Sequence, residues 1–264
     1  WVISRSFKYH RPRGPLTMAG HDANTLVQTR AAPNRLADEL PIADYPETTA
    51  QNLSGSLMAD RSAIIDWFGR FLPVGFYYRA FYRPFGVWHW WERMIRKAAG
   101  LGVANLSASP HYQDKQYLFC DVAVVGAGPA GLSAALKAAE GGASVLLVDE
   151  EPELGGSLTY HRFAIDSDAV RREADTLIAK VASHPRIKVL THALCNGWFT
   201  DHYLPVIQGD RLFKVRANSC VLATGISEQH VVFRNNDLPG VVLCSALERL
   251  LNHYAVAPQG ELVV

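Results

Sequence analysis

The sequence contains the stretch FCDVAVVGAGPAG at residues 119–131, and its fold class follows from this stretch. The apolar run of residues 119–125 is typical of a strand that is buried on both faces. Residues 130–140 have the pattern of a helix, which a glycine pair ends, and residues 144–148 predict a second strand. Because these elements form a compact βαβ unit, we expect an α/β, Rossmann-like domain with a parallel sheet.

Three glycines in the turn between this strand and this helix predict a dinucleotide-binding site. Gly126 permits a tight turn, and Gly128 lacks a Cβ, so that the backbone can approach a pyrophosphate. Gly131 allows the helix to pack close to the sheet. Free backbone N–H groups and the helix dipole at the start of the helix then attract phosphate charge. The motif follows a strand and opens a helix, which is the context that it requires.

Two acidic residues follow the second predicted strand. Asp149 and Glu150 lie 23 and 24 residues beyond Gly126, close to the roughly 20-residue offset of a ribose-binding carboxylate. A carboxylate accepts hydrogen bonds from ribose hydroxyls and repels a 2′-phosphate. The sequence therefore favours NAD or FAD over NADP, and either acid, or both together, could make the bond.

Three further segments fit the nucleotide domain of flavoprotein reductases of the two-dinucleotide-binding type. Gly155-Gly156-Ser157 stands where such a domain needs a flexible loop that passes the cofactor. Ala223-Thr224-Gly225 ends a buried strand, and its glycine suits a close approach to phosphates. Cys195 falls where these folds place backbone groups against the adenine. We therefore predict further cofactor contacts at Ser157, Cys195, Thr224 and Gly225.

The composition is that of a globular protein with a sizeable core. The chain has 264 residues, of which 48% are hydrophobic and 19% charged, and its formal charge is +1. This balance argues against a nucleic-acid or anionic-membrane footprint. No apolar run reaches the ~18 residues of a membrane span, and no signal peptide heads the chain. Four widely spaced cysteines favour a reduced, cytoplasmic setting.

Neither a metal site nor a catalytic group is predicted. The ten histidines show no zinc-binding spacing, and there is no Gly-x-Ser-x-Gly turn. No cysteine has an identifiable base. We expect the residues of this chain to bind a cofactor rather than to react.

Three regions differ in composition and predict the domain organisation. Residues 1–32 contain a basic run, and residues 33–117 hold most of the aromatic residues. Nine of the 27 aromatic residues fall within residues 76–91, which pack inside the chain or form a subunit or domain interface. Residues 56–72 suit one amphipathic helix. Residues 118–264 form the dinucleotide-binding domain.

Beyond the βαβ unit, the pattern predicts alternating helices and strands. In chain order these are a helix over 166–184, a strand over 187–190, a hairpin over 203–216, a strand over 219–223, a helix over 244–253 and a further strand in 260–264.

Five segments of the sequence carry a family resemblance in addition to the nucleotide motifs. They are RSFKYHRPRG at 5–14, QN at 51–52 with SL at 56–57, LPVGFYY at 72–78, IRKAAGLG at 95–102 and NNDLPGV at 235–241. With these segments the chain resembles the alpha subunit of heterotetrameric sarcosine oxidase over essentially its whole length. Residues 1–32 are then the C-terminal part of a ferredoxin-like domain, and residues 33–117 are an aromatic-rich helical linker.

The resemblance implies a component of a larger oxidase with several cofactors. It implies NAD bound without covalent attachment, with contacts at Ala130, Asp149, Glu150, Ser157 and Cys195, and FMN enclosed at the contact with the beta subunit. The beta subunit of this family carries FAD and the amine-oxidising site, and smaller subunits complete the assembly. The family oxidises sarcosine to glycine, passes one-carbon units to tetrahydrofolate and forms hydrogen peroxide.

The chain departs from the full family pattern in two ways. It covers the end of a ferredoxin-like domain and the first part of a nucleotide domain, so that no folate-binding residue can be named. No cysteine precedes Cys120, and cluster iron is held by thiolates, so that we expect no iron–sulfur cluster in this chain.

Two other functions are compatible with the sequence. The chain could be the alpha subunit of a related opine, octopine or proline dehydrogenase, in which the same site would hold FAD. It could also be a non-catalytic assembly module whose aromatic segment holds a partner.

Overall fold

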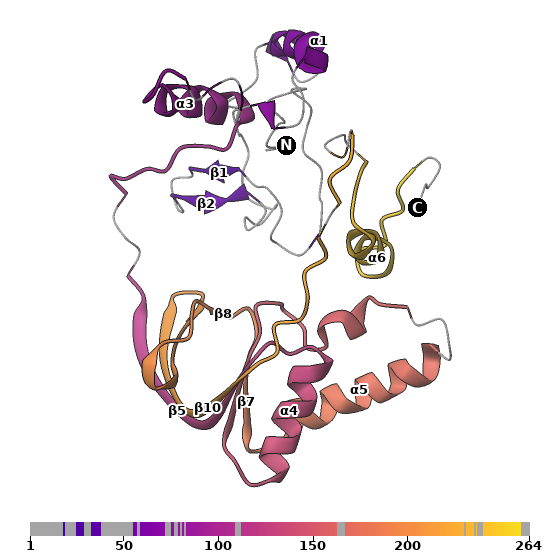
Figure 1. Cartoon of the computed structure of the whole chain (residues 1–264). Coiled ribbons are helices and arrows are strands. Elements are labelled where there is room, and N and C mark those ends of the chain that lie inside the picture. Colours follow the sequence, from indigo (N-terminus) through magenta and orange to yellow (C-terminus); the bar gives the residue numbers. More distant parts are fainter. Residues whose placement is uncertain are drawn as a thin grey trace. The chain divides into compact units, whose positions relative to one another are not determined.

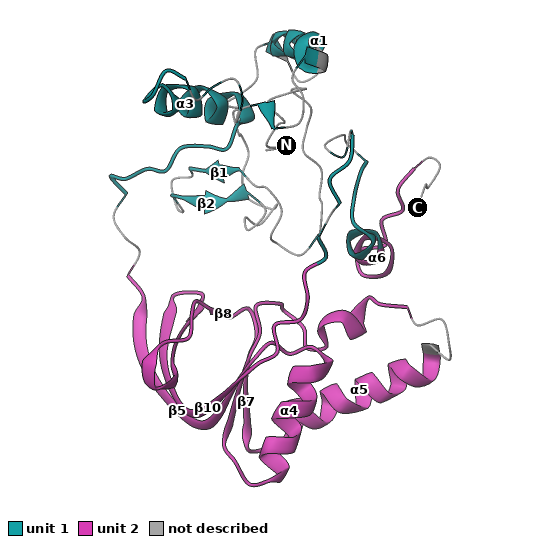
Figure 2. Ribbon diagram, viewed as in Figure 1, with its two compact units in different colours: residues 1–109, 228–247 teal, residues 110–227, 248–264 magenta. Residues whose placement is uncertain are grey.

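The computed structural model describes about three quarters of the chain, in two compact units. The described residues are 18, 25–28, 33–37, 55–56, 59–71, 75–76, 79, 81, 83–108, 112–162, 167–229, 231–234, 236 and 240–259. Unit 1 comprises residues 1–109 and 228–247, and unit 2 comprises residues 110–227 and 248–264 (Figure 2). The basic run of the predicted ferredoxin-like segment and the strand expected in 260–264 lie outside the described residues. The three-region division stays a prediction.

Unit 2 is built on a six-stranded mixed sheet (Figure 1). Its strand order is β7-β6-β5-β10-β9-β8, in which β5, β6, β7 and β10 run parallel and β9 and β8 are antiparallel to their neighbours. The strands are β5 (Asp114–Val125), β6 (Val145–Val148), β7 (Ile187–Leu190), β8 (Leu194–Cys195), β9 (Tyr203–Gln208) and β10 (Arg211–Leu222). The helices are α4 (Pro129–Glu140) and α5 (Ser167–Ser183), with the short 3₁₀ helices η5 (Gly156–Thr159) and η6 (Thr200–His202).

Two apolar clusters fix the parallel strands from both faces. On one face, fully buried side chains of α4, β6 and α5, such as Leu132, Leu147 and Val181, pack together. On the other face, β5 and β6 pack with β9 and β10 through residues such as Leu204 and Phe213. Full burial of one such side chain stabilises the fold by about 1.5–3 kcal/mol. The continuous apolar runs in the sequence reflect this burial on both faces.

The βαβ unit and the strands and helices that follow it match the predicted elements closely, with one correction. The predicted hairpin over 203–216 and the strand over 219–223 are not separate, because β10 continues without a break from Arg211 to Leu222. The reason is that β10 pairs with β5 along its whole length, from Arg211 opposite Asp114 to Leu222 opposite Val125. This pairing also starts β5 at Asp114, five residues before the predicted apolar run.

Unit 1 contains short elements. These are the paired strands β1 (Leu26–Val27) and β2 (Arg35–Leu36), the paired strands β3 (Gly55–Ser56) and β4 (Ala59–Asp60), the 3₁₀ helices η3 (Arg61–Ile64) and η4 (Gly69–Phe71), the short helix α1 (Ile65–Phe68) and helix α3 (Trp88–Ala99). The single helix predicted over 56–72 is therefore wrong. The Asp60 carboxylate accepts a hydrogen bond from the Ser62 amide (3.0 Å), so that helical structure starts only at Arg61.

The described aromatic residues of unit 1 are partly packed and partly exposed. Phe76 is buried, its ring packs edge-on against Phe81, and Phe81 packs on Trp91 with centroids 4.4 Å apart. Trp90 and Phe85 are largely exposed. The packing accounts for only some of these rings.

The last described helix is α6 (Cys244–Asn252), close to the predicted span of 244–253. Its first residues count with unit 1 and Glu248–Asn252 count with unit 2. Within unit 2, its final turn contacts the segment that follows η5, and this contact bears on the site described next.

Candidate dinucleotide site

The turn between β5 and α4 requires glycine at its first position. Gly126 has a φ of 102°, in the region that favours glycine, and its amide donates to the Val148 carbonyl (2.8 Å). A Cβ at this position would lie 2.2 Å from the Ala223 carbonyl oxygen. The chain therefore passes between the ends of β6 and β10 with no room for a side chain.

The other two glycines of the turn have opposite surroundings. A Cβ on Gly131 would lie 1.8 Å from the Gly126 carbonyl oxygen, so that glycine is needed for helix packing. Gly128 is the N-cap residue of α4 and makes no side-chain capping bond. A Cβ on Gly128 would have no heavy atom within 4 Å. Open space thus lies beside the helix N-terminus, whose partial positive charge attracts phosphate.

The acid that follows β6 contacts this turn directly. The Asp149 carboxylate accepts a hydrogen bond from the Ala127 amide, through Oδ2, and another from the Glu151 amide, through Oδ1 (2.8 Å). Asp149 is half-buried, whereas the neighbouring Glu150 is exposed. Of the two predicted acids, Asp149 is therefore brought to the glycine turn by a direct hydrogen bond.

The loop after the acids closes against the same turn. The Gly155 amide donates to the Ala127 carbonyl (2.9 Å). A Cβ on Gly156 would lie 2.9 Å from the Gly128 Cα, so that this second glycine also permits a close approach. Ser157 follows in η5 with an exposed side chain. The predicted Gly-Gly-Ser segment thus lies beside the open space at Gly128.

The end of β10 forms the remaining side of the turn. The Ala223 amide donates to the Val125 carbonyl (2.8 Å), which places Thr224 immediately beside Gly126. Thr224 and Gly225 are exposed, and Gly225 has a φ of 75°. The structure therefore brings the glycine turn, Asp149, residues 155–157 and residues 223–225 together.

Cys195 lies apart from this group in the contacts of the described residues. It pairs with Val206 in the sheet, its side chain packs against the apolar cluster of β9 and β10, and its Sγ donates to the Gly197 carbonyl (3.5 Å). The proposed backbone contact of Cys195 with adenine stays a prediction.

The other two strand cysteines belong to the core. Burial raises the pKa of the Cys120 thiol to about 11, and burial likewise raises the pKa of Cys220. All four cysteines are free thiols. Within the described ranges, no group of three or more metal-ligating side chains is found. Those same ranges hold no helix that is long and apolar enough to cross a membrane.

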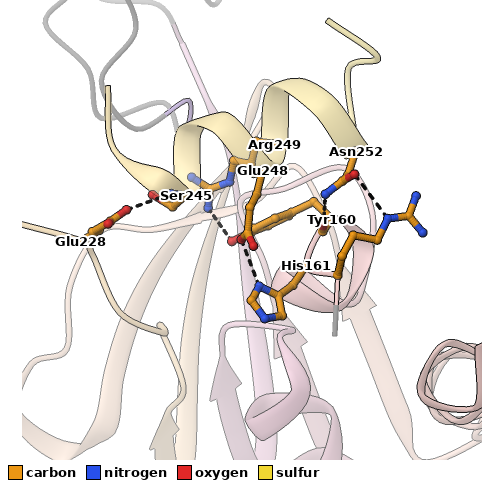
Figure 3. A network of polar contacts seen from close by, with 8 residues as sticks. Tyr160, His161, Glu228, Ser245, Glu248, Arg249 and Asn252 are labelled. Atoms are coloured by element: carbon orange, nitrogen blue, oxygen red, sulfur yellow. Dashed lines mark hydrogen bonds and ion pairs between the residues drawn. The ribbon is translucent and has the colours of Figure 1, made fainter. Parts of the chain in front are cut away.

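Sequence reasoning missed a polar network that adjoins the site (Figure 3). Tyr160, His161 and Arg162, which follow η5, contact Glu248, Arg249 and Asn252 of α6. The helix was predicted, but nothing in the sequence indicates this contact, because Tyr160 and Arg249 are 89 residues apart. A shallow hollow between α4 and α5, lined by Arg172, Thr176 and Lys180 among others, includes no residue of the predicted site.

The glycine turn, the acid and the mixed sheet define a dinucleotide-binding domain. Residues 121–242 match the sequence model of FAD dependent oxidoreductases, and residues 2–52 match that of a 2Fe-2S iron-sulfur cluster binding domain. The first match contains the turn and the acid. Residues 121–242 thus match a domain of the FAD-dependent oxidoreductase type, and unit 2 has the Rossmann-like fold that the sequence predicted.

The chain is a homologue of the alpha subunits of sarcosine oxidases. It is 38% identical over 279 aligned residues to the sarcosine oxidase alpha subunit of Rhizobium meliloti (strain 1021), an alignment that covers 97% of this chain and 28% of that protein. It is 27% identical over 166 residues to an opine oxidase subunit of Agrobacterium tumefaciens (strain Ach5), covering 55% of this chain and 32% of the relative. L-proline dehydrogenase from P. horikoshii aligns with a TM-score of 0.49 and 28% identity, over 59% of this chain and 32% of that one.

The chain spans about a quarter of the length of the sarcosine oxidase subunit that it matches. The segment that matches the 2Fe-2S domain, residues 2–52, contains no cysteine. It therefore provides none of the thiolates that hold such a cluster. The resemblance predicted from the sequence is confirmed by the alignment over nearly the whole chain.

Proposed function

We propose that this chain is the nucleotide-binding part of the alpha subunit of a heteromeric sarcosine oxidase. It holds NAD without covalent attachment at the turn of Gly126, Gly128 and Gly131. The oxidation of sarcosine to glycine, with hydrogen peroxide formed and a one-carbon unit passed to tetrahydrofolate, takes place elsewhere in the assembly. Amine oxidation belongs to the beta subunit, so that no catalytic acid or base is assigned here.

One observation supports the site most strongly. The open space beside Gly128 lies at the N-terminus of α4, and the carboxylate that follows β6 lies at the neighbouring amide of Ala127. A pyrophosphate fits the first feature because backbone amides and the helix dipole favour negative charge. A ribose fits the second because a carboxylate accepts its hydroxyls.

The roles of the individual residues follow from these positions. Gly128 and Ala130 would present backbone amides to the phosphates, and Asp149 would accept from the ribose. Ser157, Thr224 and Gly225 would contact the same cofactor from the two neighbouring segments. A bound dinucleotide can supply hydride-transfer chemistry, although we propose that NAD in this protein is structural.

The Asp149 carboxylate also supports the choice of dinucleotide. A carboxylate that accepts a hydrogen bond from a ribose hydroxyl would repel a phosphate on the same ribose. This argues for NAD or FAD over NADP. The free thiols agree with a cytoplasmic location, because disulfides are rare in reducing compartments.

The test is the identity of the nucleotide that co-purifies with the full-length protein. After denaturation, mass spectrometry should find NAD at about one equivalent per alpha subunit, in addition to any flavin of the complex. Absence of both NAD and FAD from the alpha subunit would contradict the proposal.

A second candidate places FAD in the same site, as in the alpha subunit of an opine, octopine or proline dehydrogenase. The match of residues 121–242 to an FAD-dependent family favours it. The isolated alpha subunit distinguishes the two, because flavin absorbs visible light and NAD does not. A flavin spectrum from the isolated alpha subunit would show that the site binds FAD rather than NAD.

The partners proposed here follow from the homology. The beta subunit, together with the smaller subunits of the oxidase, would bind this chain, with FMN enclosed at the beta contact. The exposed rings of Phe85 and Trp90 are candidates for an interface. Co-purification of FMN and the beta subunit with a tagged alpha subunit tests this part.

A further inference from the structure

The segment after η5 is fixed to α6 by side-chain hydrogen bonds and by a cation–π contact. Figure 3 shows Tyr160 and His161 on one side and Glu248, Arg249 and Asn252 on the other, and Arg162, next to His161 in the chain, also contacts Asn252. We call these six residues the α6 anchor. All of them belong to unit 2. The anchor joins two parts of the chain that are far apart in sequence, beside the proposed dinucleotide site.

Arg249 and Asn252 carry most of this contact. The Arg249 guanidinium donates to the Tyr160 hydroxyl (3.1 Å) and lies over the Tyr160 ring, 4.7 Å from its centroid. The Asn252 amide donates to the Tyr160 backbone carbonyl (2.8 Å) and accepts from Arg162 (3.3 Å). Tyr160 is thus fixed through its ring, its hydroxyl and its backbone.

The remaining pair contributes little. His161 Nδ1 lies 3.0 Å from a Glu248 carboxylate oxygen, and the two side chains are 43% and 35% exposed. Ion pairs at such exposure contribute about 0–1 kcal/mol, since water and salt screen them. We therefore assign the anchoring to Arg249 and Asn252.

A short series of hydrogen bonds connects the anchor to the glycine turn. The amides of Tyr160 and His161 donate to the Ser157 carbonyl (3.4 and 2.8 Å), so that the end of η5 is tied to the anchored segment. At its other end, Gly155 donates to the Ala127 carbonyl (2.9 Å). The short helix that carries Ser157 is therefore held at both ends, by the glycine turn and by α6.

We propose that Arg249 and Asn252 are positioning residues for dinucleotide binding, which hold η5 and Ser157 beside the open space at Gly128. This inference rests on the proposed function of the turn. A segment that is already ordered loses less conformational entropy when it closes on a ligand, and that gain appears as affinity. Loosening the anchor should weaken binding without removing any group that touches the dinucleotide.

The experiment compares Arg249→Met and Asn252→Asp with wild type in the full-length protein freed of its nucleotide. Arg249→Met keeps the side-chain length but removes both contacts to Tyr160, and Asn252→Asp removes the donor to the Tyr160 carbonyl. With NAD and FAD as the probes in calorimetry, each variant should raise the dissociation constant about fivefold, the effect of one lost hydrogen bond, and the double variant at least tenfold. Leu251→Ala, on the same helix at a 44% exposed position, is the matched control and should bind like wild type.

Hydrogen exchange supplies the readout that separates positioning from general destabilisation. In the nucleotide-free variants, the amides of Tyr160 and His161 should exchange faster than in wild type, while those of β6 should not change. Addition of the dinucleotide should restore their protection. Arg249→Lys keeps the charge but not the planar guanidinium, so that its dissociation constant should lie between those of wild type and Arg249→Met. This variant replaces Arg249→Met in the experiment if Arg249→Met does not fold.

The outcomes are distinguishable from those of the proposed function. If wild type binds neither NAD nor FAD, the proposed function fails, and this inference fails with it. If wild type binds and the variants bind equally well, or if exchange rises throughout unit 2 rather than at residues 160–161, the anchor is only structural and this inference alone is overturned.

Discussion

Replacing Gly131 with alanine tests how closely α4 packs on the glycine turn. The alanine Cβ would lie 1.8 Å from the Gly126 carbonyl oxygen and 3.3 Å from the Ala223 Cβ. To bring the first contact to 3.0 Å, the helix or the turn would have to move by about 1.2 Å. The Gly126 carbonyl belongs to the backbone of the turn, and the Gly126 amide is bonded to the Val148 carbonyl at the end of β6, so that this contact is not relieved without cost.

The size of the effect follows from two opposing terms. Overpacking typically destabilises a fold by 1–3 kcal/mol, and for a backbone contact this short we expect a cost of about 3 kcal/mol. Replacing glycine by alanine inside a helix stabilises the helix by about 1 kcal/mol. The free energy of unfolding should therefore fall by about 2 kcal/mol, which lowers the Tm by about 4–8 °C for a domain of 150–250 residues.

Thermal and urea unfolding of the full-length protein measures this effect, with Gly128→Ala as the control. At Gly128 the new Cβ meets no atom within 4 Å, and the φ of −71° suits alanine. This control should change the unfolding free energy by less than about 1 kcal/mol, yet lower the dinucleotide affinity at least tenfold, because its methyl occupies the proposed pyrophosphate position. If Gly131→Ala is as stable as wild type, the argument for close packing is refuted.

Three further predictions concern other residues. Asp149→Asn should weaken dinucleotide binding about tenfold and lower the unfolding free energy by about 2 kcal/mol, because a charged acceptor of two backbone amides is lost. Calorimetry measures the affinity and urea unfolding measures the stability. Unchanged affinity would argue against the ribose contact. Hydrogen bonds from Ser144 hold the pKa of Asp121 below its ordinary value, so that its contribution to stability is present above pH ~4 and is lost as the pH falls through the lower folded pKa. Urea midpoints from pH 2 to 6 should therefore depend less on pH in Asp121→Asn than in wild type, and an identical profile would contradict this. Because burial raises the pKa of Cys120 to about 11, only about one Cys120 thiol in a thousand is ionised at pH 8. After iodoacetamide treatment, peptide mapping should therefore show that Cys120 is modified far more slowly than the exposed Cys244. Equal rates would show that Cys120 is accessible.

The sequence was most informative where local pattern and burial agree. The βαβ unit was predicted to within a few residues, because a strand buried on both faces reads as a continuous apolar run and glycines end the helix. The glycine turn was likewise predictable, since the motif encodes close backbone approaches that only glycine allows, whereas the choice between Asp149 and Glu150 was left open by the sequence.

Long-range pairing was the part that local pattern could not give. β10 was predicted as two strands because Arg216 and Asn218 interrupt its apolar residues, yet pairing with β5 carries it through. The single helix predicted over 56–72 was wrong because Asp60 caps a helix that begins later, and because one pair of short strands, β3 and β4, precedes it. The α6 anchor could not be foreseen, since its two halves are joined only by the fold.

Dinucleotide binding at the turn of Gly128 is best tested by a crystal structure of the full-length protein soaked with NAD or FAD. We expect a pyrophosphate within hydrogen-bond distance of the Gly128 and Ala130 amides and a ribose hydroxyl on the Asp149 carboxylate. A dinucleotide bound elsewhere, or a space beside Gly128 that is filled by side chains, would contradict it.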